Sequence, residues 1–169
     1  MKRGHKLALV VVLQLLILFG MVGFKYYTLN FGTPVLLKTA PVDPWDVFRG
    51  EYVRLGYEMS RINKAMIKED LSGDSFGQRV YVVLEKKEKY WEAVAVHQKR
   101  PRLEENQVFI KAELQYYDEY AGTYFLTYGL ESYYVEEGQG KELEQNAELD
   151  VQARVDRFGN AVLEEVVAR

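Results

Sequence analysis

The distribution of hydrophobic residues divides the chain into an apolar N-terminal run and a longer part in which apolar and polar residues mostly alternate. Residues 7–24 are apolar except for Gln14. Eighteen helical residues reach about 27 Å, and extension to Tyr27 matches the ~30 Å hydrocarbon core of a bilayer. We therefore expect an uncleaved transmembrane anchor over residues 7–27. The alternative is a cleaved signal peptide, whose apolar region is usually shorter and ends at a small-residue site.

The charges that flank this run predict its orientation. Three basic residues lie among the first six residues, whereas Lys25 alone follows the run directly. By the positive-inside rule, residues 1–6 form a cytoplasmic stub and residues 28–169 lie outside the cytoplasm. The sequence therefore predicts a single-pass protein of the cell membrane with an extracytoplasmic C-terminal domain.

Beyond the anchor, the hydrophobic pattern has mainly a period of two, which is typical of half-buried β-strands. Residues 156–160, DRFGN, predict a turn between the last two strands, which form a hairpin. We expect a mainly β fold, in which one β-barrel or sandwich-like domain with one or two short helices follows the transmembrane helix. The expected strands cover residues 33–40, 51–60, 79–87, 90–98, 108–118, 148–155 and 161–168.

Two segments interrupt the alternation. Residues 60–76 place Ile62, Met66 and Ile67 at helical spacing, which predicts a short helix or an excursion between strands. Residues 136–150 hold six acids and one lysine, and strong helix formers dominate part of this segment. A solvated acidic helix is the simpler interpretation, and an acidic docking surface is the alternative.

Composition excludes several kinds of chemistry. The chain has no cysteine, which rules out disulfides, thiol nucleophiles and thiolate metal sites. Residues 7–169 hold 19 Lys and Arg against 25 acids, a net charge of −6, which argues against a nucleic-acid partner. His97 is the one histidine of the outer domain, and we expect a structural or solvent-facing role for it.

The stretch PVDPWDVFRGEYVRLGYEMS, residues 41–60, combines turn signals with the start of a strand. Its two prolines push the residues before them away from helical angles, and Gly50 permits a backbone angle that other residues avoid. We therefore expect a corner at Arg49 and Gly50 that leads into a strand. Three nearby carboxylates can brace Arg49 by charge-assisted hydrogen bonds, and they belong to Asp43, Asp46 and Glu51.

This stretch resembles the signature of the membrane-anchored bacterial family named for its G-D-Y-x-x-L-x-Y motif, the GDYXXLXY family. Glu51 replaces the aspartate of that motif. The candidate binding residues that the resemblance implies in this first block are Asp43, Pro44, Asp46, Phe48, Arg49, Gly50, Glu51, Tyr52, Leu55 and Tyr57.

A second block, YGLESYYVEEG, is similar to the family's Tyr-Gly-Ile-Glu-x-Tyr-Phe-Val-Pro-Glu-Gly segment. Glu136 stands where a proline is common, and the resemblance as a whole covers nearly the entire chain. The family implies no established reaction, and its association with multispanning membrane proteins suggests such a partner. The candidate residues of the second block are Tyr128, Gly129, Glu131, Tyr133, Tyr134, Val135, Glu137 and Gly138.

These features favour a membrane-anchored binding or assembly module of the bacterial cell envelope, with no cofactor and no metal. Seven of the 13 tyrosines lie between Tyr116 and Tyr134, and tyrosine suits both sheet cores and interfaces. We expect the two blocks to meet in the fold and form one groove. We also expect Tyr124, Tyr128 and Tyr133 to face the core, and Tyr116 and Tyr120 to be exposed.

Two other functions remain open at this point. The first block and the second have some similarity to strands of serine-lysine signal peptidases, but the nucleophilic serine before the strand is missing, so a hydrolase-like or degenerate scaffold is the alternative. The carboxylates of Asp43, Asp46 and Glu51 could instead hold a cation, although Arg49 beside them favours an arginine-carboxylate brace.

Overall fold

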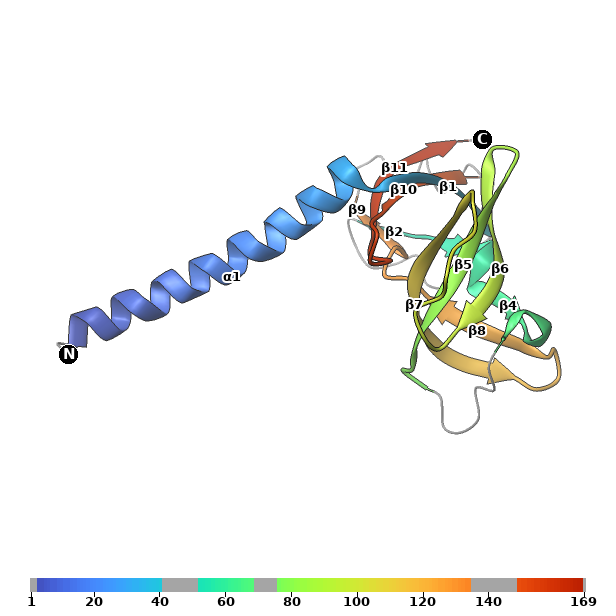
Figure 1. Ribbon diagram of the computed structural model, residues 1–169, viewed down its shortest axis with the longest axis horizontal. Helices are drawn as coiled ribbons and strands as arrows, with labels where there is room; N and C mark the ends of the chain where they lie inside the picture. The colour runs from blue at the N-terminus through green and yellow to red at the C-terminus, as the bar shows by residue number, and fades with distance from the viewer. Residues whose placement is uncertain (1–2, 41–51, 69–75, 135–148, 169) are drawn as a thin grey trace.

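The computed structural model describes residues 3–40, 52–68, 76–134 and 149–168. One long helix, α1 (Arg3–Phe31), projects from a body of antiparallel strands that wrap into a nearly closed, barrel-like sheet (Figure 1). The fold is therefore mainly β with a single N-terminal apolar helix, as the hydrophobic pattern predicts.

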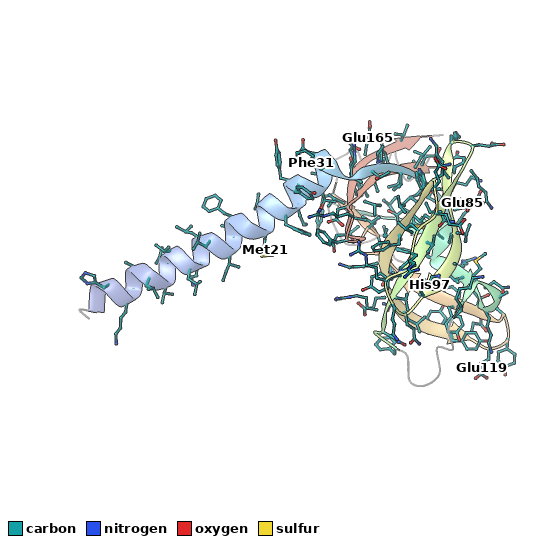
Figure 2. The ribbon with its side chains drawn as sticks, viewed as in Figure 1. Met21, Phe31, Glu85, His97, Glu119 and Glu165 are labelled. Atoms are coloured by element: carbon teal, nitrogen blue, oxygen red, sulfur yellow. The ribbon has the colours of Figure 1, made fainter. Side chains whose placement is uncertain are left out.

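Helix α1 stands apart from the body over most of its length. Residues Gly4–Phe31 are apolar enough and long enough to cross a bilayer, and none of the most apolar window is buried within the protein. A signal sequence has the same properties. Figure 2 shows Met21 on the isolated part of the helix and Phe31 where the chain reaches the body. The helix contains the predicted anchor and continues four residues beyond Tyr27.

The first sheet has four strands in the order β11-β10-β1-β3. The chain enters it directly from α1, since Gly32 separates the helix from β1. Strand β1 pairs with β10 from Thr33 opposite Val155 to Lys38 opposite Asp150, and β3 continues along the end of β1. The bounds are β1 (Thr33–Ala40), β3 (Gly56–Tyr57), β10 (Leu149–Val155) and β11 (Ala161–Ala168).

The second sheet has five antiparallel strands in the order β4-β8-β7-β5-β6. Its two edges approach each other, because Ile67 forms a parallel bridge with Val96 and the Lys68 N–H donates to the Val96 carbonyl at 3.1 Å. This contact nearly closes the barrel. The bounds are β4 (Arg61–Asn63), β5 (Arg79–Lys87), β6 (Tyr90–His97), β7 (Gln107–Asp118) and β8 (Thr123–Thr127).

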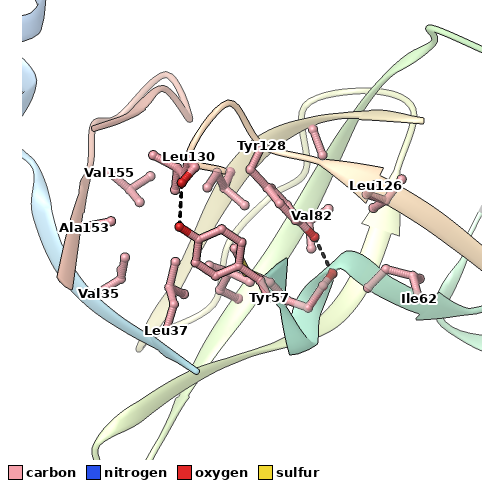
Figure 3. Close-up of a cluster of buried hydrophobic side chains, with 14 of the residues drawn as sticks. Val35, Leu37, Tyr57, Ile62, Val82, Leu126, Tyr128, Leu130, Ala153 and Val155 are labelled. Carbon is pink, nitrogen blue, oxygen red and sulfur yellow. Dashed lines mark hydrogen bonds between the residues drawn. The ribbon is translucent and has the colours of Figure 1, made fainter. Parts of the chain in front are cut away.

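A two-stranded ribbon, β2 (Tyr52–Arg54) with β9 (Ser132–Tyr134), completes the body. The inward side chains of the two larger sheets form one apolar cluster, against which Tyr133 of β9 packs (Figure 3). Burial of such a cluster is the main favourable term in folding. Its largest fully buried apolar members are Val35, Leu37, Tyr57, Ile62, Val80, Val82, Leu84, Val96, Ile110, Leu114 and Val151.

One prediction about the middle of the chain is wrong, and another is only partly described by the structure. Residues 51–60 do not form one strand, because the backbone changes partners at Leu55: β2 pairs with β9, β3 pairs with β1, and the 3-10 turn η2 (Glu58–Ser60) follows. Residues 60–76, expected to form a short helix or an excursion between strands, form strand β4 and a second 3-10 turn, η3 (Lys64–Met66), in their described part. The acidic helix expected within residues 136–150 lies outside the described residues.

The turn between β10 and β11 fastens the end of α1 to the body. Asp156 is buried, and its carboxylate accepts hydrogen bonds from the backbone N–H of Phe158 at 2.8 Å and of Asn160 at 2.9 Å. It also accepts from the Asn160 amide at 2.8 Å and from the hydroxyl of Thr28, which is fully buried, at 3.3 Å. One carboxylate therefore shapes the predicted turn and joins it to the helix.

We expect Asp156→Ala to destabilise the full chain by about 2–3 kcal/mol, because one buried donor and three partly buried donors lose their acceptor at once. Denaturant unfolding of the protein in detergent measures this. Glu165→Ala, at an exposed position on β11, is the matched control and should change stability by less than about 0.5 kcal/mol. Equal stability of the two variants would contradict the role given to Asp156.

Candidate functional site

The two blocks singled out in the sequence lie against each other. Strands β2 and β9 pair with Tyr52 opposite Tyr134 and Arg54 opposite Ser132. Just beyond the ribbon, the Leu55 N–H donates to the Glu131 carbonyl at 2.8 Å. The expected meeting of the blocks is therefore correct for their described parts.

Two buried tyrosines connect the blocks by reciprocal hydrogen bonds, which we call the tyrosine clasp. The Tyr57 hydroxyl, from the first block, donates to the Leu130 carbonyl of the second at 2.7 Å. The Tyr128 hydroxyl, from the second block, donates to the Met59 carbonyl just after the first. Figure 3 shows both phenol rings within the core cluster, with these bonds at their tips. The final tyrosine of the signature is thus a structural brace.

The spacing within the second block has a local explanation. Gly129 has a φ of +76°, a left-handed conformation that glycine adopts without strain. This turn brings the carboxylate of Glu131 back to the backbone N–H of Tyr128, which donates to it. The Tyr-Gly-x-Glu pattern therefore encodes a tight turn that sets the direction of the Tyr128 ring.

Burial controls the ionisation of both clasp tyrosines. Removal from water raises the pKa of Tyr57 and of Tyr128 above the ordinary value, and the negative charge of Glu131 raises both further. Both hydroxyls therefore stay protonated at neutral pH and act as hydrogen-bond donors.

The candidate residues differ in their burial. Leu55, Tyr57 and Tyr128 are buried, Glu131 and Tyr133 are half-buried, and Gly129 and Tyr134 are exposed. Tyr52 is placed by its backbone alone. The brace at Arg49, the carboxylate cation site and the enzymatic alternative stay predictions, because the remaining candidates lie outside the described residues. These candidates are Asp43, Pro44, Asp46, Phe48, Arg49, Gly50, Glu51, Val135, Glu137 and Gly138.

The expected division of the tyrosines agrees with the structure. Tyr124 and Tyr128 are buried, and Tyr133 is half-buried and packs on the core cluster. Tyr116 and Tyr120 are exposed. The alternation of the strands accounts for this division, because successive side chains point to opposite faces.

A surface pocket of about 400 Å³ borders the second block and was not anticipated from the sequence. Its residues come from separate strands, so no linear spacing marks it. A smaller pocket of about 160 Å³ lies elsewhere, between β6 and the segment from Glu58 to Met66. The larger pocket is lined by Arg79, Lys111, Ala112, Glu113, Thr127, Tyr128, Gly129, Glu131 and Asn160.

His97 is half-buried at the end of β6. Within residues 3–40, 52–68, 76–134 and 149–168, no group of three or more His, Asp or Glu side chains is placed to hold a metal ion.

The clasp predicts a loss of stability at alkaline pH. The folded-state pKa of each clasp tyrosine lies above the unfolded value of about 10, so its contribution is complete below pH ~10 and is lost as the pH rises beyond that. Denaturant unfolding across this range measures the slope. The double variant Tyr57→Phe/Tyr128→Phe should lose less stability between neutral and alkaline pH than the wild type, and an unchanged slope would contradict the assignment.

Comparison with known proteins identifies the family. The family model described as GDYXXLXY protein matches residues 14–166, which include both blocks, the end of the helix and all the described strands up to β11. No curated protein and no solved structure matches the chain. The chain belongs to the GDYXXLXY protein family.

Proposed function

We propose that this protein is a membrane-anchored, extracytoplasmic binding module of the cell envelope that assembles with an integral membrane protein through the β2–β9 ribbon. The observation that carries the proposal is the position of this ribbon. It contains strands from both family blocks, and it lies on the side of the barrel from which α1 leaves (Figure 1).

The exposure of α1 supports the anchor. A run of large apolar side chains, among them Leu16, Phe19 and Met21, is more than 60% exposed. Such a surface is unfavourable in water and is stable in a bilayer. The buried Thr28 and its bond to Asp156 also make the helix end part of the domain. Cleavage beyond this point would remove a core contact, which favours a retained anchor over a signal peptide.

The ribbon itself has the composition of a contact surface. The signature residues Leu55, Tyr57 and Tyr128 face inward and serve the fold. Arg54, Ser132 and Tyr134 are exposed on the two paired strands. Arginine and tyrosine are enriched at protein interfaces, where they combine apolar contact with hydrogen bonding.

The place of the ribbon favours a particular class of partner. Because α1 and the ribbon lie on the same side of the barrel, we infer that a protein that contacts the ribbon lies at the membrane surface or within the membrane. A multispanning membrane protein meets this requirement, since its helices can pack beside α1 while its loops reach Arg54 and Tyr134. The negative net charge of the outer domain makes nucleic acid a poor alternative.

Site-specific photo-crosslinking in native membranes tests the proposal. A photoreactive residue at Tyr134 should crosslink to one membrane-embedded protein, whereas the same residue at Tyr120, which is fully exposed on the turn between β7 and β8, should not. We expect Arg54→Glu to weaken the crosslink from position 134 by about tenfold, the effect of ~1.4 kcal/mol of lost interaction.

Two results would contradict the proposal. Release of the wild-type protein from membranes by alkaline extraction would refute the anchor. With the anchor established, equal crosslinking from positions 134 and 120, or none at position 134, would refute the ribbon as the contact surface.

A further inference from the structure

The larger pocket combines charges of both signs without pairing them internally. Arg79 and Lys111 supply two cations, and Glu113 and Glu131 supply two carboxylates. Arg79 and Glu113 are direct cross-strand partners on β5 and β7, with Cβ atoms about 5 Å apart, yet within the described residues neither makes an ion pair. Both side chains are exposed to solvent. The pocket therefore presents separate positive and negative groups to a ligand.

Both the cationic and the anionic side chains of the pocket keep hydrogen-bonding groups that a ligand can use. The Lys111 ammonium donates to the Asn160 side-chain oxygen at 2.8 Å, which leaves two of its three N–H groups for a ligand. The Glu131 carboxylate accepts from the Tyr128 N–H through one oxygen, which leaves the other as an acceptor. A purely anionic ligand would meet two carboxylates, and a purely cationic one would meet two cations. A zwitterion with an acidic oxygen group and a primary amine satisfies both sets.

A chain of hydrogen bonds leads from this pocket to the end of the apolar helix. Lys111 donates to Asn160, the Asn160 amide donates to Asp156 at 2.8 Å, and Asp156 accepts from Thr28 at 3.3 Å. Thr28 is four residues beyond Phe24, the last residue of the apolar run, which is about 6 Å along the helix. The polar headgroup layer on each side of a bilayer is about 5–7 Å thick. If α1 crosses the bilayer, Thr28 lies at headgroup depth, and the hydrogen bonds connect it to Asn160 and Lys111 at the rim of the pocket.

Side chains around the same turn suit an interface with lipid. Tyr26 and Phe31 are exposed at the end of α1, and Phe158 is partly exposed at the tip of the turn between β10 and β11. The Arg157 guanidinium lies over the Phe158 ring, 4.8 Å from its centroid. Aromatic rings and basic groups gather at the headgroup level of membrane proteins. Figure 1 shows β7 and this turn on the helix side of the barrel.

We propose that the pocket binds the headgroup of an aminophospholipid from the bilayer that α1 crosses. The phosphate lies against Arg79 and Lys111, and the primary ammonium group lies against Glu113 and Glu131. The inference rests on the membrane anchor proposed above. It adds a ligand class to that function, because the bound headgroup fixes the orientation of the barrel on the membrane surface and hence the position of the β2–β9 ribbon.

Native mass spectrometry of the full chain, released from nanodiscs with equal parts phosphatidylethanolamine, phosphatidylcholine and phosphatidylglycerol, tests this directly. We expect the wild type to retain phosphatidylethanolamine preferentially, because the quaternary amine of phosphatidylcholine cannot donate hydrogen bonds and phosphatidylglycerol has no cation. Lys111→Gln and Glu113→Gln should each reduce that retention by about tenfold, equivalent to ~1.4 kcal/mol. Added inorganic phosphate should not displace the lipid.

The controls separate the site from the anchor and from the fold. Glu58→Gln and Arg61→Gln make the same changes of charge at the smaller pocket and should leave lipid retention unchanged. Thermal unfolding of each variant shows whether that variant is folded. If Lys111→Gln is unstable, Glu113→Gln still tests the site, because Glu113 is at an exposed position. A wild type that does not enter nanodiscs refutes the anchor and the site together. Entry without preference for phosphatidylethanolamine, equal retention by the pocket variants, or displacement by phosphate refutes the lipid site alone.

Discussion

The tyrosine clasp is the interaction on which the arrangement of this domain depends. Two phenols in the core each donate to a carbonyl at the other family block, Tyr57 to Leu130 and Tyr128 to Met59. A buried carbonyl without a donor costs about 1–3 kcal/mol, so the two bonds fix the backbone on both sides of the core. The β2–β9 ribbon and the short strand β3 then have defined positions. The described residues of the motif that names the family therefore hold together two segments that are distant in the sequence.

The junction at Asp156 connects this braced body to the helix. Its carboxylate joins Thr28 of α1 to the turn between β10 and β11, and Asn160 of the same turn reaches Lys111 in the larger pocket. Gly32 is suited to this junction, because a Cβ there would lie 2.4 Å from the Thr28 carbonyl oxygen. The helix end and the larger pocket are therefore connected, and the β2–β9 ribbon lies on the side of the barrel from which α1 leaves (Figure 1). Both proposals, for the partner and for the lipid, follow from this arrangement.

The sequence predicts burial better than it predicts strand pairing. Residues 33–40, 79–87 and 161–168 form strands with the expected bounds, because regular alternation and clear turn signals delimit them. Alternation also continues through Leu55, Tyr57 and Met59, all of which are buried, yet the backbone changes partners within this run. The sequence pattern does not indicate the larger pocket, because Arg79, Lys111 and Asn160 come together only after the sheets form. The signature identifies Tyr57, but its structural role depends on the Leu130 carbonyl, whose position the sequence does not indicate.

A double-mutant cycle between Tyr57 and Tyr128 tests the central claim most directly. The free energy of unfolding of the full chain in detergent is compared for the wild type, Tyr57→Phe, Tyr128→Phe and the double variant. The clasp predicts a loss of about 1–3 kcal/mol for each single variant and a coupling energy of at least ~0.5 kcal/mol, because both bonds hold the same pair of segments. Single variants as stable as the wild type would show that the two hydroxyls do not hold the blocks together.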